Sequence, residues 1–203
     1  MQLSREDHAR IAAAIHAAEQ KTSGEIVCVL ARASSDQTAT PALGAALAAL
    51  ATPWPLIAFT QWPVQHVFIA QLLVFAAVFA ALTPFRVRAA LTPRAWRRAS
   101  AHRAAMEQFV ARGMKRTRAR TGVLIFVSLA ERYARVVADA AIDSKVKQAD
   151  WQEAIDALIA CLREDRLADG YIAAIERCCA LLARHFPRAG DDVNELPDRI
   201  FLI

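Results

Sequence analysis

Charged residues are absent from one long stretch of this chain. Between Asp36 and Arg86, 49 residues (37–85) pass without an acidic or basic side chain. Two apolar segments, 41–59 and 66–85, fill most of this stretch, and the short linker TQWPVQ (60–65) separates them. About 20 apolar residues in a helix cross the roughly 30 Å hydrocarbon core of a bilayer. The pattern therefore predicts a transmembrane helical hairpin over 37–85.

A helical hairpin buried in a soluble core is one alternative. Such a hairpin should keep a polar face, and neither segment has one. Trp54 and Trp62 lie near the turn, where indole rings favour the headgroup level. Pro53 and Pro55 would break a helix in water, but neighbouring groups can satisfy the freed carbonyls in a membrane. A hairpin that docks in the groove of a partner protein is the second alternative.

The charges around the apolar segments predict their orientation. A hairpin returns the chain to the side it left, so both flanks share one compartment. The turn has no Lys or Arg, whereas the residues after the second segment are strongly basic, and such residues stay in the cytoplasm. The N-terminus, MQLSREDHARI, lacks the apolar core of a signal peptide. The expected membrane-surface residues are Arg86, Arg88, Arg94, Arg97, Arg98 and Arg103.

The residues before the hairpin have the apolar pattern of a helix, followed by that of a strand. SRED (4–7) has the spacing of a capping box, and Ile11, Ile15 and Ala18 follow on one helical face. Gly24 ends this helix. EIVCVLA (25–31) is apolar on both alternations, which is typical of a central strand that is covered on both faces.

The residues after the hairpin predict further helices and strands. A helix is expected over 93–116, and then a β-hairpin with strands 123–129 and 133–139. Asp150 and Glu153 have capping-box spacing for a helix over 150–164, and a second helix follows over 167–186. RIFLI (199–203) is expected to be an edge strand or a docked terminus.

This order of elements predicts an α/β fold. A small mixed sheet is flanked by helices, and the transmembrane hairpin is inserted after the first strand. The expected parts are 1–36 and 86–203 for the α/β domain and 37–85 for the hairpin. Closing a long insertion costs little free energy, so such an arrangement is physically unproblematic.

Composition changes this picture little. The chain is 56% hydrophobic with a net charge of +5. Its four cysteines, Cys28, Cys161, Cys178 and Cys179, have no metal-binding spacing, and free thiols in a reducing compartment are expected.

Three segments in order resemble the TPM domain family. They are KTSGEIVCVLA (21–31), RTGVLIFVSLAERYARVVADAAI (120–142) and DGYIAAIERC (169–178). That family includes a thylakoid lumen protein, a photosystem II repair factor, a nematode acetylcholine-receptor modulator and many bacterial membrane proteins. The chain looks most like a bacterial subgroup that carries a hydrophobic hairpin. The resemblance implies a TPM-like α/β/α sandwich around a central sheet.

The resemblance also implies candidate chemistry, because some TPM proteins are reported as acid phosphatases or metal binders. The matching acidic positions are Asp139, Asp143 and Asp169, which would hold a divalent cation such as Ca²⁺ or Mg²⁺ if their loops converge. The alternative is that the three aspartates only end a strand and start helices. The chain departs from the family in the segment ADAAIDSKV (138–146), which lacks the usual glycines. No nucleophile elbow, phosphate loop or HExxH motif is present.

The segment 86–120 is the strongest polar signal, with eleven Lys and Arg against the single acid Glu107. Directly after an apolar span, such a segment favours contact with anionic headgroups. The scarcity of aromatic residues for base stacking disfavours nucleic acid as a partner. The sequence therefore predicts a membrane-anchored TPM-like module of unassigned activity at the cytoplasmic face of the bacterial inner membrane. The bilayer is its first expected partner, and a membrane protein is the second candidate. A metal-dependent phosphatase is the alternative.

Overall fold

The computed structural model describes residues 3–34, 39–83, 93–189 and 194–203. The chain forms two compact units. The first contains Met1–Ser34 and Arg98–Ile203, and the second contains Ser35–Arg97. The second unit thus includes the predicted hairpin together with residues 86–97, which were expected in the α/β domain.

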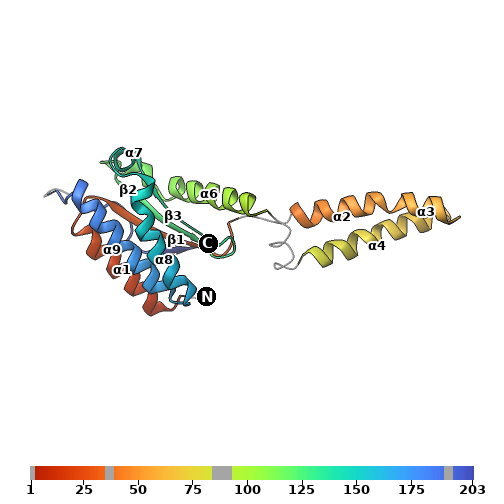
Figure 1. The fold of residues 1–203 in the computed structure, drawn as a ribbon, viewed down its shortest axis with the longest axis horizontal. Coiled ribbons are helices and arrows are strands. Elements are labelled where there is room, and N and C mark those ends of the chain that lie inside the picture. Colours follow the sequence, from red (N-terminus) through yellow and green to blue (C-terminus); the bar gives the residue numbers. More distant parts are fainter. Residues whose placement is uncertain (1–2, 35–38, 84–92, 190–193) are drawn as a thin grey trace. The chain divides into compact units, whose positions relative to one another are not determined.

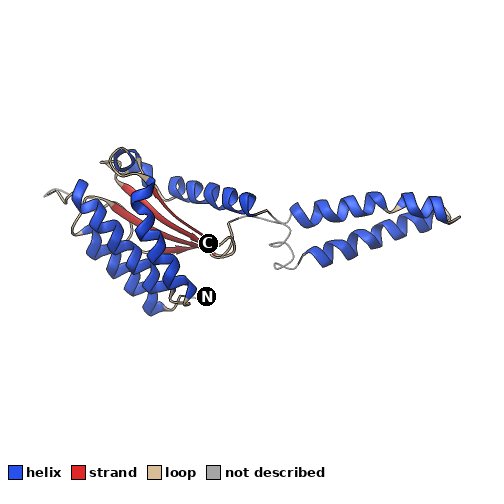
Figure 2. Ribbon diagram, in the orientation of Figure 1, coloured by secondary structure: helices blue, strands red, loops and turns tan. Residues whose placement is uncertain are grey.

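The first unit is built around a four-stranded mixed sheet, as predicted (Figures 1 and 2). The strand order is β3-β2-β1-β4. β1 is parallel to both β2 and β4, and β3 is antiparallel to β2. The strands are β1 (Glu25–Ala31), β2 (Gly122–Ser128), β3 (Tyr133–Ala138) and β4 (Ile200–Leu202). Every residue of β1 and β2 is buried, which agrees with the continuous apolar runs in the sequence.

Helices cover both faces of the sheet (Figure 2). α1 (Arg5–Glu19), α8 (Gln152–Arg163) and α9 (Leu167–His185) pack on the face that carries Ile26, Cys28 and Leu30. α6 (Arg94–Ala111) packs on the face that carries Val27 and Val29, through its buried Ala105 and Phe109. The α/β arrangement of the prediction is therefore confirmed.

The helix ends show which local signals were informative. The predicted capping box at the start of α1 is confirmed, because Ser4 and Asp7 each accept a backbone N–H of the other. The predicted capping box of Asp150 with Glu153 is wrong. The carboxylate of Asp150 instead accepts the backbone N–H of Lys147 at 2.7 Å and closes the short η2 (Gln148–Trp151) before α8.

The predicted helix over 93–116 is shorter than expected. α6 ends at Ala111, and Gly113 has a φ of 77°, a conformation that glycine adopts without steric cost. The chain then forms η1 (Met114–Arg116) and turns towards β2. A β-carbon on Gly122 would lie 2.8 Å from the carbonyl oxygen of Met114, so glycine allows this close approach.

The C-terminal segment forms the edge strand that the sequence predicted. The backbone N–H of Ile203 donates to Leu30, and the N–H of Arg32 donates to Ile203, each at 2.9 Å. β4 therefore lies beside β1 at the end of the sheet opposite β3. All four cysteines are free thiols in the structure, and Cys28, Cys178 and Cys179 are buried.

The parallel strands define two edges of the sheet. We call the edge at which β1, β2 and β4 end the carboxyl edge, and the edge at which they begin the amino edge. The chain leaves the first unit just after β1, where the carboxylate of Glu131 accepts the backbone N–H of Ser34 at 3.0 Å. It returns through α6, whose far end leads to the start of β2. Both attachment points of the hairpin therefore lie at the carboxyl edge.

The second unit contains α2 (Ala39–Ala51), α3 (Pro53–Phe59) and α4 (Val64–Leu82). The stretches Pro41–Phe59 and Val64–Leu82 are each 19 residues long and are apolar enough to cross a membrane. The break between α2 and α3 lies at Thr52, next to Pro53, where the predicted first segment continued without interruption. Ala45 and Ala49 are buried in the packing of α2 against α4, and a β-carbon on Gly44 would meet Leu82.

Candidate functional site

Asp139 lies at the amino edge of the sheet. Its backbone N–H donates to the carbonyl of Gly122 at the start of β2, and its side chain caps α7 (Ala140–Asp143). The guanidinium of Arg120 donates to both carboxylate oxygens. Burial by itself would raise the pKa of Asp139, but the hydrogen bonds from Arg120 and from the Ala140 N–H outweigh burial and lower it.

Of the other two aspartates, only Asp143 lies near Asp139, because its backbone N–H donates to the Asp139 carbonyl at 2.9 Å. Asp143 is an exposed residue at the end of α7. Asp169 lies in the first turn of α9, near the carboxyl edge, because Tyr171 on that turn donates to the carbonyl of Val29 at 2.8 Å. Arg10 donates to Asp169 at 2.6 Å, and this hydrogen bond is the main reason that the pKa of Asp169 is lowered.

The structure thus keeps Asp139 and Asp169 at opposite edges of the sheet, each paired with an arginine. Among the described residues, no group of three or more His, Cys, Asp or Glu side chains is arranged to hold a metal ion. The bound divalent cation stays a prediction, for which this arrangement of the aspartates provides no assembled site.

The predicted membrane-surface arginines cluster at the start of α6. Arg94, Arg97 and Arg98 lie in its first two turns, and Trp96 beside them is 73% exposed. Arg103 is exposed more than a turn further along the helix. Arg86 and Arg88 lie outside the described residues. Of these arginines, Arg98 and Arg103 belong to the first unit and lie on the helix through which the chain re-enters it.

Two further arginines lie at the carboxyl edge and were not singled out from the sequence. Arg132 is in the turn between β2 and β3, with a φ of 50°, and Arg163 ends α8. Together they border a groove of about 740 Å³. Its remaining lining residues are Val127, Ser128, Leu129, Tyr133, Ala134, Ile159 and Leu162. Sequence patterns gave no signal for this groove, because its two walls come from segments about 30 residues apart.

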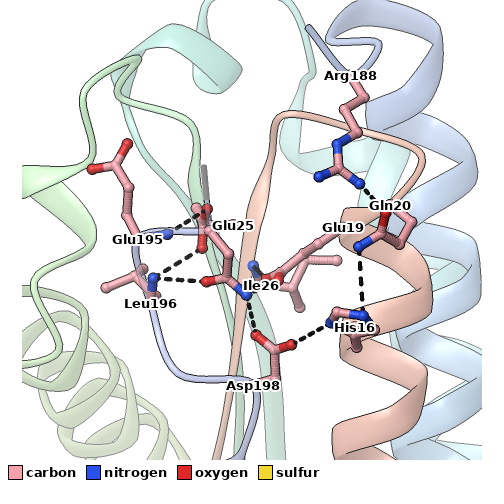
Figure 3. A network of polar contacts seen from close by, with 10 residues as sticks. His16, Glu19, Gln20, Glu25, Ile26, Arg188, Glu195, Leu196 and Asp198 are labelled. Carbon is pink, nitrogen blue, oxygen red and sulfur yellow. Dashed lines mark hydrogen bonds and ion pairs between the residues drawn. The ribbon is translucent and has the colours of Figure 1, made fainter. Parts of the chain in front are cut away.

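A buried acidic network lies at the amino edge (Figure 3). The carboxylate of Glu25 accepts the backbone N–H groups of Glu195 and Leu196, at 3.1 and 3.2 Å. The carboxyl group of Glu19 accepts the backbone N–H of Ile26 and the side-chain amide of Asn194, both at 3.0 Å. These contacts hold the segment before β4 against the start of β1.

Asp198 and His16 extend this network. His16 Nδ1 lies 2.9 Å from one carboxylate oxygen of Asp198, and the Asn194 amide donates to the other. Burial, with a smaller contribution from the nearby carboxylates of Glu25 and Asp198, raises the pKa of Glu19 to about 9 against the opposing effect of the Ile26 N–H. Glu19 is therefore protonated at neutral pH, and the network joins the C-terminal segment to α1 and β1.

The chain matches the profile of a known domain family. A family profile described as the TPM domain matches residues 70–181, which is more than half of the chain. The chain belongs to the TPM domain family. The resemblance seen in the sequence is thus confirmed, and the match includes Asp139, Asp143 and Asp169.

A solved structure has the same fold as this TPM domain protein. It is the NMR structure of the BA42 protein from the psychrophilic bacterium Bizionia argentinensis, with a TM-score of 0.62 and 20% sequence identity. The alignment covers 100% of this chain and 97% of BA42. At this identity the likeness establishes the fold alone. A search of the curated proteins finds no match.

The aspartates, the arginines of α6 and the groove residues of this TPM domain protein occupy different parts of the fold. The aspartates are divided between the two edges, the described arginines of α6 lie towards the carboxyl edge, and the groove opens at that same edge. Sequence reasoning found the aspartates and the α6 arginines but missed the groove and the buried glutamates. The carboxyl edge therefore combines basic side chains, an apolar groove and the attachment points of the hairpin.

Proposed function

We propose that this protein is an integral membrane protein of the bacterial inner membrane, in which a hairpin anchors a cytoplasmic TPM domain. The observation that carries this proposal is the surface of α2, α3 and α4. Leu47, Phe68 and Leu72 are 68%, 65% and 69% exposed on helices that contain no charged residue. Exposed apolar surface of this extent is stable in hydrocarbon and marks an interaction site in water.

The orientation follows from the basic residues at the start of α6. Arg94, Arg97 and Arg98 begin the first described helix after the second apolar helix, whereas the turn between the apolar helices has no Lys or Arg. Basic residues next to a span stay in the cytoplasm, so both flanks are cytoplasmic and the turn at 60–63 faces the other side. Trp96 at the start of α6 suits the headgroup region, where amphipathic rings are enriched.

The domain acts in this proposal as a binding or accessory module for membrane proteins, with its carboxyl edge towards the bilayer. Both attachment points of the hairpin lie at this edge, which supports that orientation. A metal-dependent phosphatase that uses Asp139, Asp143 and Asp169 is the competing hypothesis. The separation of Asp139 from Asp169 favours the module hypothesis. A cation bound by both aspartates would need oxygen atoms of each within about 2.6 Å of itself.

Extraction of membranes with alkaline carbonate tests the anchor. The full chain should stay with the membrane pellet, as a spanning hairpin does, and require detergent for release. Release of the chain by carbonate would show that the apolar helices bind a protein partner or a surface. Assay of the detergent-purified chain for phosphate-ester turnover with Ca²⁺ or Mg²⁺ separates the two functions, since the module should show none.

A further inference from the structure

The groove at the carboxyl edge is a second candidate binding site. It lies between the last turns of α8 and the turn that joins β2 to β3. Its volume of about 740 Å³ is within the range of ligand pockets, which are typically about 300–1,000 Å³. The apolar part of its lining consists of Val127, Leu129, Ala134, Ile159 and Leu162.

Most of these apolar side chains are only partly covered by the core. Leu129, Ala134, Ile159 and Leu162 pack against the cluster beneath the sheet, yet each keeps surface that faces the groove. A ligand with an apolar chain would cover this surface and displace water from it. The lining therefore selects for an apolar group rather than for a sugar or a nucleotide.

The rim of the groove carries positive charge. Arg132 and Arg163 are both exposed, and neither takes part in an ion pair within the described residues. A guanidinium group matches phosphate oxygens in a forked geometry and is weakly hydrated, so it readily binds phosphate. The groove thus presents apolar surface beside two arginines that have no acidic partner in the described part of the chain.

We propose that this groove binds an anionic phospholipid, with one acyl chain on the apolar lining and the headgroup phosphate held by Arg132 and Arg163. The site rests on the proposed function, since the carboxyl edge must face the bilayer for a lipid to reach it. The side chain of Ser128 in the groove lining donates to Glu131, which also binds the N–H of Ser34.

A membrane lipid fits these observations better than a peptide. The groove lies at the edge of the sheet at which the chain leaves the first unit after β1, and basic residues of α6 would attract anionic headgroups as well. A peptide with a free carboxylate would satisfy the same two arginines, but nothing in its chemistry requires this location. Peptide binding is therefore the competing outcome of the test.

The full chain, purified in mild detergent from membranes that contain phosphatidylglycerol, provides the test. Native mass spectrometry should detect one phosphatidylglycerol per chain, and phosphatidylcholine added at equal concentration should not replace it. Ala134→Trp fills the groove, and Arg132→Asn with Arg163→Gln removes the charge at the rim. Asn is suitable at 132 because it tolerates a positive φ. Each change should lower the retained lipid about tenfold, as expected for one or two lost charge-assisted contacts or a blocked cavity.

Arg116→Gln is the matched control, because Arg116 is an exposed arginine in η1, which leads to the start of β2 at the amino edge. It should retain lipid as the unchanged chain does. A phosphatidylglycerol with a photoactivatable acyl chain gives a readout that needs no variant, and it should label residues within 127–134 and 159–163. Labelling confined to α2 and α4, or equal lipid retention in all variants, would overturn the proposal.

Two other results have distinct meanings. Binding of an apolar peptide acid that is lost in Ala134→Trp, without any retained lipid, would also overturn the lipid site. A chain that carbonate releases from membranes contradicts the membrane anchor itself. A carbonate-resistant chain without lipid in the groove contradicts only the present inference, so the failure of each claim can be recognised separately.

Discussion

The guanidinium of Arg120 donates two hydrogen bonds to the carboxylate of Asp139, at 2.6 and 2.9 Å. The same carboxylate accepts the N–H of Ala140 and begins α7. Its side chain is 3% exposed, so nearly all of its hydrogen-bonding capacity is directed to the protein. The pair therefore stabilises the connection that follows β3, at the amino edge of the sheet.

Replacing Asp139 by Asn should destabilise the domain by about 1–3 kcal/mol, because charge-assisted hydrogen bonds to Arg120 are lost in a buried place. Thermal unfolding of the full chain in detergent measures this effect. Asp143→Asn is the control and should leave the melting temperature unchanged, since Asp143 is exposed. Phosphate-ester turnover that disappears in Asp139→Asn would instead support the phosphatase hypothesis.

Glu19 should make stability fall as pH rises from about 5 to 9. Its folded pKa is about 9 and its ordinary value is 4.5, so in this window the unfolded chain releases a proton that the folded chain keeps. The loss is at most about 1.4 kcal/mol per pH unit. Below the ordinary value both states are protonated, and this contribution to the pH dependence disappears.

The variant Glu19→Gln isolates this effect, because an amide has the same shape and does not titrate. Its melting temperature should vary less between pH 5 and 9 than that of the unchanged chain. Glu153→Gln, at an exposed position on α8, should keep the original pH dependence. Identical profiles for Glu19→Gln and the unchanged chain would show that Glu19 is not the titrating group.

The start of α6 should lie nearer the bilayer than its end. Trp96 and Val110 are 73% and 56% exposed, and 14 residues correspond to roughly 21 Å along a helix. Spin labels at Trp96→Cys and Val110→Cys, on a chain with the four native cysteines replaced by serine or alanine, can be compared in nanodiscs. The label at 96 should be the more accessible to lipid-soluble oxygen, and the label at 110 to an aqueous nickel complex. The reverse order would contradict the proposed orientation of the carboxyl edge.

A charge in α4 should prevent stable insertion. Leu72 is 69% exposed and lies in the middle part of α4, where an arginine costs about 2.5–3.5 kcal/mol. Leu72→Arg should therefore increase the fraction of the chain that carbonate releases. Ala160→Arg on the exposed surface of α8 is the matched control. Equal release of both variants would argue that α4 does not contact hydrocarbon.

The sequence predicted those features that depend on neighbouring residues. The continuous apolar runs of β1 and β2, the Ser4–Asp7 capping box and the apolar segments all have a local period or spacing. Helix boundaries were less accurate where a single residue decides them, as Gly113 does after α6.

The rest depends on which distant segments the fold brings together. No sequence pattern indicated the hydrogen bonds of Glu25, which begins an apolar run. Its partners Glu195 and Leu196 lie about 170 residues later. Arg132 and Arg163 line one groove only because α8 packs beside β3. The convergence of Asp139 with Asp169 was a question of topology, and the sheet places them at opposite edges.

The side of the membrane on which the turn lies tests the central claim most directly. Gln61→Cys, between the two apolar helices, and Arg118→Cys, on the α/β domain, can be placed singly in the chain without its native cysteines. A maleimide that crosses the outer but not the inner membrane should label Cys at 61 in intact cells, and should label 118 only after lysis. Labelling of both positions or of neither in intact cells would contradict a hairpin that crosses the inner membrane from a cytoplasmic TPM domain.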